Sequence, residues 1–349
     1  MLFFAYLLSG GVRMLYAKQQ GGNYVNAQDA NRVEHYFCPT CRQAVILKRG
    51  ELKAAHFAHR EHGCSAFSEG ETSEHLAGKQ LLVKLWSQLD CQVELEAYQA
   101  NLRQRPDVLC AFPDGHQLAL EFQCAPLSVS QMVHRSAGYQ TAHFKFFWLL
   151  GQRHYLRKHL TQQIVQFIRW HANVGFYLVY LNPAYQRFEV LYGIQMADLL
   201  PVKYFRFYTK SVPQLLHFFQ TDHHVRYLPL TQRERNQQEQ RLALKIHYRD
   251  RQIYAAQNFC YRHHWSFAET ARSTLASSYF PPIYRQPPYL WKIFAKNLVN
   301  SSRSWQQVLT PKILFQLPFV KLGLVCAQEW QNFGKVMRKI AFSSNYRYN

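Results

Sequence analysis

The sequence predicts an α/β fold, with the elements between residues 69 and 172 in the order helix, strand, strand, strand, helix, strand. Leucines recur every four positions over residues 73–89, which is typical of a helix with one apolar side. Apolar and polar residues alternate over residues 92–98, as they do in a half-buried strand. Residues 143–150 form an apolar run without alternation, which indicates a strand that is buried on both faces.

Two strands joined by a Pro-Asp-Gly turn lie in the middle of this order and carry acidic residues. Asp107 opens the first strand, while Glu121 and Gln123 lie in the second, on the face opposite to its leucines. Two carboxylates on adjacent strands can hold Mg²⁺ or Mn²⁺, with Gln123 orienting the water or the phosphate and Glu74 of the preceding helix as a further acid. The set predicts metal-dependent phosphodiester cleavage. The alternative is an ordinary hairpin whose acidic side chains are solvated.

Four more residues are candidates for contact with DNA. Arg135 and Tyr139 are four positions apart on the second helix, so they share a face from which both could contact phosphate. Arg103 and Arg105 lie just before the first acidic residue and could hold the same anion. Each of these residues fits a solvated surface equally well.

The second helix is expected to begin at Ser128, because Gln131 stands at capping-box spacing from it. After the last strand of the α/β region, the pattern favours a helix over residues 153–170 and then a hairpin from FYLVYLN to RFEVLYG. Residues 232–265 read as one long basic helix within a mostly helical C-terminal region. The expected parts of the chain are an N-terminal extension at residues 1–13, a small module at 14–68, the α/β domain at 69–172 and the C-terminal region at 173–349.

The small N-terminal module carries a pattern of metal ligands. Cys38 and Cys41 form a Cys-x2-Cys pair, and His56 and His59 follow at a spacing that suits a tetrahedral zinc site. Cys64 could replace either histidine. The segment has few large apolar residues to fold it otherwise, so we expect Zn²⁺ with a structural role. A redox Cys-x-x-Cys or a pair of buried thiols is the alternative.

The start of the chain and the pattern of its cysteines indicate in which cellular compartment the protein is found. The apolar run at the N-terminus is about eight residues long, too short to cross a bilayer, and it lacks the features of a signal peptide. Met14 opens a more ordinary beginning. Of eight cysteines, only two form a Cys-x-x-Cys pair and six are scattered, which does not suggest a secreted disulfide framework. We therefore expect a cytoplasmic protein without a transmembrane segment.

The charge balance is the strongest compositional signal. Lysine and arginine number 41 against 21 acidic residues, which gives a net charge of +20. Such a field favours a polyanionic partner, either nucleic acid or an anionic membrane surface, although a merely basic soluble protein would show it too. Aromatic residues make up 15% of the chain, and those interleaved with arginine suit stacking on unpaired bases. The sequence holds no motif for Ser/His/Asp catalysis and no P-loop.

Several ordered motifs over residues 14–151 resemble the competence protein CoiA family of Gram-positive bacteria. They are YFCPTC, HFAH with a following cysteine, SEHLAGKQLLVKLW, RPDVL, LALEFQC, the Arg135 and Tyr139 pair, and WLLG. The resemblance implies a PD-(D/E)XK restriction-endonuclease-like core, a mixed sheet flanked by helices, behind a zinc-finger-like module. It further implies a role in natural transformation, acting on incoming single-stranded DNA near the recombination step, with recombination proteins as partners.

By the family motif, Asp107 and Glu121 would be the strand acids and Glu74 the helix acid. Gln123 stands where most of the wider superfamily carries lysine, so no ammonium group is present there to stabilise developing charge. Two functions follow as expectations: a metal-dependent DNA nuclease, or a non-cleaving DNA-binding recombination mediator with the same fold. A basic zinc-containing scaffold that binds protein is a third.

Overall fold

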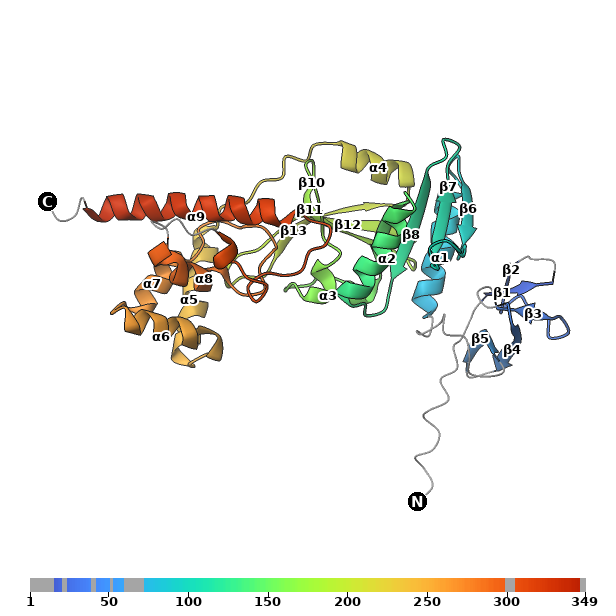
Figure 1. Cartoon of the computed structure of the whole chain (residues 1–349), viewed down its shortest axis with the longest axis horizontal. Helices are drawn as coiled ribbons and strands as arrows, with labels where there is room; N and C mark the ends of the chain where they lie inside the picture. Colours follow the sequence, from blue (N-terminus) through green and yellow to red (C-terminus); the bar gives the residue numbers. More distant parts are fainter. Residues whose placement is uncertain are drawn as a thin grey trace, which may run out of the picture. The chain divides into compact units, whose positions relative to one another are not determined.

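The computed structural model describes residues 16–20, 24–38, 42–50, 53–59, 72–298 and 305–345 (Figure 1). By the density of their internal contacts the residues form two compact units. The first contains Met1–Ala125 and Ala137–Phe147, and the second contains Pro126–Ser136 and Trp148–Asn349.

The N-terminal part of the first unit is a small antiparallel sheet. Its core is a cluster of small residues around two rings, because Tyr36 and Phe57 pack with their centroids 4.8 Å apart. Residues 44–50 and 53–59 form an antiparallel pair of strands, with Val45 opposite His59 in the register. The strand order is β2-β1-β3-β4-β5. The strands are β1 (Tyr16–Gln19), β2 (Tyr24–Asn26), β3 (Tyr36–Phe37), β4 (Ala44–Gly50) and β5 (Lys53–His59).

The rest of the first unit holds the predicted helix and its strands. Helix α1 (Ser73–Trp86) begins where the hydroxyl of Thr72 accepts a hydrogen bond from the His75 amide at 3.2 Å. The strands β6, β7 and β8 are antiparallel neighbours, and β9 lies next to β8. Their inward residues, such as Val108 and Phe122, are buried. The bounds are β6 (Gln92–Leu95), β7 (Val108–Ala111), β8 (Gln117–Gln123) and β9 (Lys145–Leu150).

Helix α2 (Val129–Thr141) begins as the sequence predicts. The Ser128 hydroxyl accepts from the Gln131 amide at 3.2 Å, and the Gln131 side chain accepts from the Ser128 amide at 3.0 Å. This reciprocal pair is a capping box, which satisfies two donors that the first helical turn leaves without partners.

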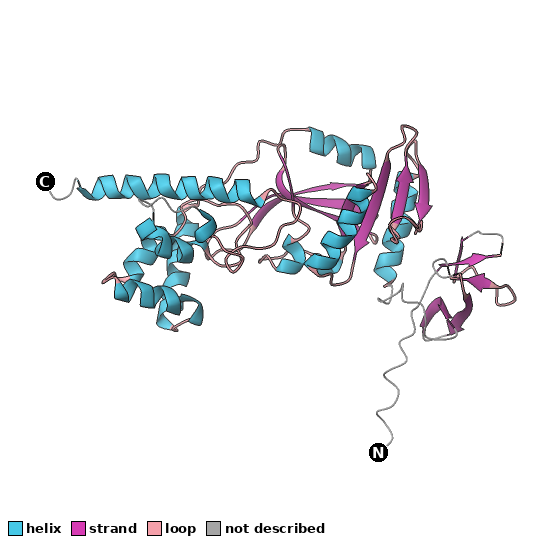
Figure 2. Cartoon of the chain, viewed as in Figure 1, coloured by secondary structure: helices cyan, strands magenta, loops and turns pink. Residues whose placement is uncertain are grey.

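The second unit carries strands β10 to β13 and the end of β9, in the order β13-β12-β11-β9 with β10 beside β11 (Figure 2). The predicted hairpin is confirmed as an antiparallel pair of β11 and β12, while β11 runs parallel to β9. Helix α4 (Val212–Gln220) packs Phe218 on Phe207 with stacked rings 4.2 Å apart. The strands are β10 (Arg169–His171), β11 (Gly175–Asn182), β12 (Arg187–Gln195) and β13 (Lys203–Thr209).

The expectation of one helix over residues 153–170 is wrong. The segment contains the 3₁₀ turn η1 (Gln152–His154), the short helix α3 (Gln162–Val165) and strand β10. Tyrosines from the strands take the hydrogen bonds that a helix would have used. The Leu156 amide donates to the Tyr180 hydroxyl at 3.1 Å, and the Tyr204 hydroxyl donates to the Leu156 carbonyl at 3.2 Å.

The single long basic helix expected over residues 232–265 is also divided. Helix α5 (Gln232–His247) ends before Arg249, whose φ of 50° is left-handed and cannot continue a helix. The Asp250 carboxylate then accepts from the Gln252 amide at 2.8 Å and starts the next turn. The elements after the break are η2 (Arg251–Ile253) and α6 (Tyr254–Arg262).

The remaining C-terminal elements are helical, as the sequence predicts. They pack around a cluster that includes Leu242, Cys260 and Tyr289. Among the described residues, no helix is both long enough and apolar enough to cross a bilayer. The helices and 3₁₀ turns are α7 (Phe267–Thr274), α8 (Pro288–Ala295), η3 (Lys296–Leu298), η4 (Trp305–Gln307) and α9 (Leu322–Asn345).

Candidate functional site

The two predicted strand acids come together in the first unit. The register pairs Val108 of β7 with Leu120 of β8, and extending it by one residue sets Asp107 beside Glu121. The Asp107 carboxylate accepts from the Phe122 amide at 2.7 Å and contacts Nε2 of His75 at 3.2 Å. Its side chain is only 13% exposed. The strand pairing thus holds this carboxylate rigidly at the end of β7.

Glu121 is more deeply buried than Asp107, and a side chain of helix α2 holds its carboxylate. It is 1% exposed, and its carboxylate accepts a hydrogen bond from the Tyr139 hydroxyl. Tyr139 is itself fully buried, next to Phe146. Tyr139, expected from the sequence to contact DNA, therefore orients an acid in this structure. Arg135 is half-buried, with its guanidinium 5.9 Å from the centre of the Trp148 ring.

A third carboxylate, which sequence reasoning missed, adjoins these two. Glu96 follows β6 with a φ of 51°, and its amide donates to the Asp107 carbonyl at 3.0 Å. Burial raises the pKa of Glu96, but ion pairs with Lys79 and Arg105 outweigh it, so the net shift is downward. Lys79 is 1% exposed, and Nη1 of Arg105 lies 3.1 Å from the carboxylate. Arg105, expected at the anion, is thus a partner of Glu96.

The charges of all three carboxylates act on the imidazole of His75. Burial lowers the pKa of His75, yet the neighbouring Asp107, Glu96 and Glu121 together raise it above its ordinary value. His75 and Lys79 are four residues apart on α1, on the stripe that also carries Leu82. A histidine and a lysine on an otherwise apolar stripe are the sequence signal that could have revealed them.

The structure also places three further predicted residues, namely Glu74, Gln123 and Arg103. Glu74 is half-buried, and its charge, like that of Asp107, adds to burial in raising the pKa of the Cys124 thiol. The Gln123 side-chain amide donates to the Ala125 carbonyl at 2.7 Å. Arg103 is exposed in a turn, with a φ of 52°. The structure thus brings Glu74 and Gln123 close to the acidic cluster.

The acidic cluster offers the donor chemistry of a hard cation. Within the described ranges there is no group of three or more histidine, cysteine or acidic side chains arranged to hold a metal ion. Mg²⁺ commonly binds through one or two carboxylates and completes its shell with water. The two carboxylates of Asp107 and Glu121 fit that requirement.

The zinc ligands proposed for the N-terminal module are only partly described. Cys41 and Cys64 lie outside the described residues. Cys38 is buried at the end of β3, and its amide donates to the Gln43 carbonyl at 2.8 Å. His56 and His59 face opposite sides of β5, because side chains alternate along a strand, and burial lowers the pKa of His59. The zinc site stays a prediction.

Comparisons with known proteins agree with this architecture. The family model for "Competence protein CoiA, nuclease-like domain" matches residues 71–219, and that for "Competence protein CoiA, N-terminal domain" matches residues 22–67. The competence protein CoiA of Bacillus subtilis (strain 168) is 36% identical over 118 residues, which cover 33% of this chain and 31% of that relative. No solved structure matches the chain. Two adjacent domain models of one family and a curated relative agree, and the chain therefore belongs to the competence protein CoiA family.

Proposed function

We propose that this protein is a metal-dependent nuclease that acts on incoming single-stranded DNA in the cytoplasm during natural transformation. The observation that carries the proposal is the convergence of Glu96, Asp107 and Glu121 on His75, inside a chain whose net charge is +20. Like charges gathered in a buried place are costly unless cations compensate them. Lys79 and Arg105 compensate Glu96. The net positive charge of the chain would attract a polyanion, and a metal ion at Asp107 and Glu121 would reduce the repulsion between these acids and phosphate.

Asp107 and Glu121 would hold Mg²⁺ or Mn²⁺, which supplies Lewis-acid catalysis and an activated water when it is bound. The protein's part is to keep both carboxylates in place through the Phe122 amide and the Tyr139 hydroxyl. Gln123 would position the water or the phosphate from the same strand. Glu74 would add negative charge from α1, and Arg103 and Arg135 would contact the DNA backbone.

A second function is favoured by the lack of an available lysine at the candidate site. Gln123 replaces the lysine of most related nucleases, and its amide already donates to the Ala125 carbonyl. The nearest ammonium group in the cluster, Lys79, is 1% exposed and paired with Glu96. This arrangement favours a DNA-binding recombination mediator that keeps the fold without cutting.

Cleavage assays on labelled single-stranded and duplex DNA with Mg²⁺ or Mn²⁺ separate the two functions. Asp107→Asn and Glu121→Gln keep the shape of each side chain and remove its charge, so a nuclease should lose about 10²-fold or more in rate. Asp114→Asn is the matched control, because Asp114 is 65% exposed in the turn between β7 and β8. Strand binding without metal-dependent cleavage above the two site variants would replace the nuclease with the mediator.

A further inference from the structure

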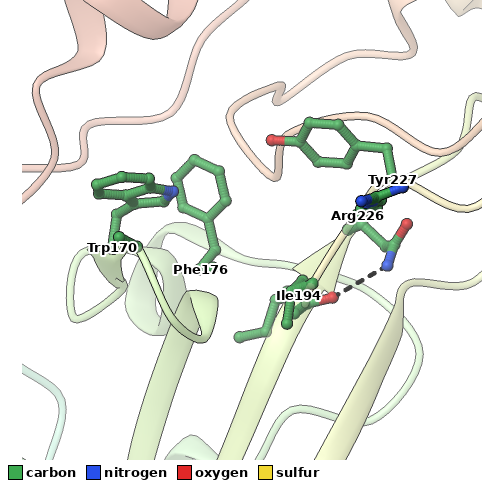
Figure 3. Close-up of a pocket in the computed structure, with 10 residues that line it drawn as sticks. Trp170, Phe176, Ile194, Arg226 and Tyr227 are labelled. Carbon is green, nitrogen blue, oxygen red and sulfur yellow. Dashed lines mark hydrogen bonds between the residues drawn. The ribbon is translucent and has the colours of Figure 1, made fainter. Parts of the chain in front are cut away.

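The second unit contains a pocket of about 270 Å³ at one end of the β11–β12 hairpin. Figure 3 shows Trp170 and Phe176 on one side of it, Arg226 and Tyr227 on the other, and Ile194 between them. Trp170 is 56% exposed and Tyr227 is 47% exposed, whereas Phe176 and Ile194 are buried. The walls are therefore aromatic, and two of the rings are accessible from solvent.

The pocket is held in shape by the segment that carries Arg226 and Tyr227. Val225 packs on two glycines with left-handed backbones, since a Cβ on Gly175 or Gly193 would lie 3.1 or 3.0 Å from its Cγ1. On either side of Val225, the His223 amide donates to the Asn173 carbonyl at 3.0 Å, and the Leu228 amide donates to the Gln195 side chain at 2.8 Å. The wall that carries Arg226 and Tyr227 is thus fixed by contacts within the protein.

The polarity of the pocket selects an anion. Arg226 is the one charged side chain among the lining residues, which include no carboxylate. Within the described part of the chain, Arg226 has no acidic partner. The nearby Asp222 instead pairs with His224 at 3.0 Å. A ligand that fits this site has a planar ring for the aromatic walls and a negative charge for the guanidinium.

We propose that this pocket binds one unpaired base of single-stranded DNA together with its phosphate. The base would stack on Trp170, and Arg226 would contact the phosphate. The volume lies just below the roughly 300–1,000 Å³ of ordinary ligand pockets, so it suits a single nucleotide at most and not a duplex. This inference rests on the proposed function in one respect only, that the ligand is DNA, and it does not require cleavage.

Binding of a fluorescein-labelled oligothymidine, measured by anisotropy in EDTA, tests the pocket. Trp170→Ala should weaken binding about fivefold or more, and Trp170→Phe should restore most of it, because stacking needs only an aromatic face. Arg226→Ala should reduce the slope of log affinity against log salt by about 0.7, the loss expected for one phosphate contact. Tyr261→Ala is the matched control, since Tyr261 is 82% exposed on α6.

Two further probes separate base from backbone. An oligonucleotide of abasic sites should bind wild type and Trp170→Ala equally, and so should a blunt duplex. Thymidine monophosphate, titrated alone, should compete weakly with the oligonucleotide for wild type. The mononucleotide and the unlabelled oligonucleotide are compared at equal total nucleotide concentration. If both compete equally well, the pocket binds a free nucleotide and the single-strand proposal is wrong.

The outcomes also separate this proposal from the proposed function. If Trp170→Ala binds like the Tyr261→Ala control while wild type still cuts DNA, the pocket proposal fails and the nuclease stands. If Trp170→Ala weakens binding but no metal supports cleavage, the pocket stands and the nuclease fails. If the protein binds no single-stranded DNA at all, both are wrong.

Discussion

Each buried carboxylate of the candidate site is held by a different kind of donor. Asp107 accepts from a backbone amide and contacts a histidine, Glu121 accepts from a tyrosine hydroxyl, and Glu96 pairs with lysine and arginine. Hydrogen bonds to charged groups contribute more than those between neutral groups. The positions of these acids therefore depend on side chains that need not touch DNA.

Tyr139→Phe tests this dependence for Glu121. The substitution keeps the buried ring beside Phe146 and removes one donor to a carboxylate that is 1% exposed. We expect the free energy of unfolding in urea to fall by about 1–3 kcal/mol. Tyr185→Phe should change it little, because Tyr185 is 64% exposed. Equal stability of the two variants would contradict the role assigned to Tyr139.

Glu234 provides a prediction of pH dependence in the second unit. Burial raises the pKa of Glu234, but hydrogen bonds from Lys203, the Thr231 amide and Tyr279 lower it to about 2. The ordinary value is 4.5, so the folded state binds this proton less readily than the unfolded state. The stabilisation is present above pH 4.5 and is lost as the pH falls toward about 2.

Glu234→Gln cannot titrate, so it should be less stable than wild type at pH 7 by about 1–2 kcal/mol, and the difference should shrink between pH 4.5 and 3. Urea unfolding at a series of pH values measures this difference. Glu239→Gln, on the exposed side of the same helix, is the control. A difference that grew as the pH fell would have the wrong sign.

The sequence predicts those site residues whose positions depend only on nearby residues in the chain. Asp107 and Glu121 follow from strand alternation and from a short turn, and the strand register, extended by one residue, sets them side by side. His75, Lys79 and Glu96 could not be assigned in this way. Their roles come from contacts between α1, β6 and β7, and a single sequence does not encode those distances in any local pattern.

At the scale of elements, a glycine sets how closely α1 approaches β8. A Cβ on Gly78 would lie 2.0 Å from Cε1 of Phe122, a ring that is 1% exposed and has no room to move. The absence of that Cβ lets α1 carry Glu74 and His75 up to the strand acids. Gly78 is therefore a packing requirement of the candidate site rather than a weakness in the helix.

Gly78→Ala should destabilise the protein by about 1–3 kcal/mol, the usual result of overpacking a core, even though alanine favours helices. It should also reduce DNA cleavage, because α1 is displaced from the acids. Gly323→Ala on α9 is the matched control: its nearest contact would be an ordinary 3.8 Å from Trp305, so it should be neutral or slightly stabilising. Thermal unfolding and the cleavage assay together measure both effects.

The helices that the sequence misassigns show why elements are harder to predict than the acids. Over residues 153–170, tyrosine hydroxyls from β11 and β13 satisfy backbone groups that helical periodicity would have paired internally. At residues 248–250, a left-handed Arg249 and the Asp250 cap end one helix and start another. Over residues 153–170, side chains distant in the sequence determine the local structure. At residues 248–250, a local helix cap does so, and hydrophobic spacing does not predict such a cap.

The N-terminal module gives a prediction about zinc. We expect one zinc ion per chain, measured by elemental analysis of purified protein, and its loss in Cys38→Ser. Because His59 shares a side of β5 with Phe57, which packs in the same cluster as Cys38, His59→Ala should lose more zinc than His56→Ala. Protein that holds no zinc with its cysteines intact would disprove the site.

At the scale of the whole molecule, a net charge of +20 coexists with a cluster of buried or half-buried carboxylates near His75. The net charge of +20 favours a polyanionic partner, whereas the carboxylates near His75 would repel its phosphates. Affinity for single-stranded DNA should fall steeply as salt rises, by about 0.7 in log–log slope for each phosphate contacted. A scaffold that binds only protein would show no such dependence.

The same division of charge predicts opposite effects of one substitution on binding and on cleavage. In EDTA, Asp107→Asn or Glu121→Gln should tighten DNA binding, because a negative charge facing the phosphate is removed without a change of shape. With Mg²⁺ or Mn²⁺ present, the same variants should lose cleavage, and wild type should bind more tightly than it does in EDTA. Asp114→Asn, at an exposed turn, should change neither property appreciably. Anisotropy titrations with and without metal measure these shifts, and weaker binding of the two site variants in EDTA would place the DNA elsewhere on the protein.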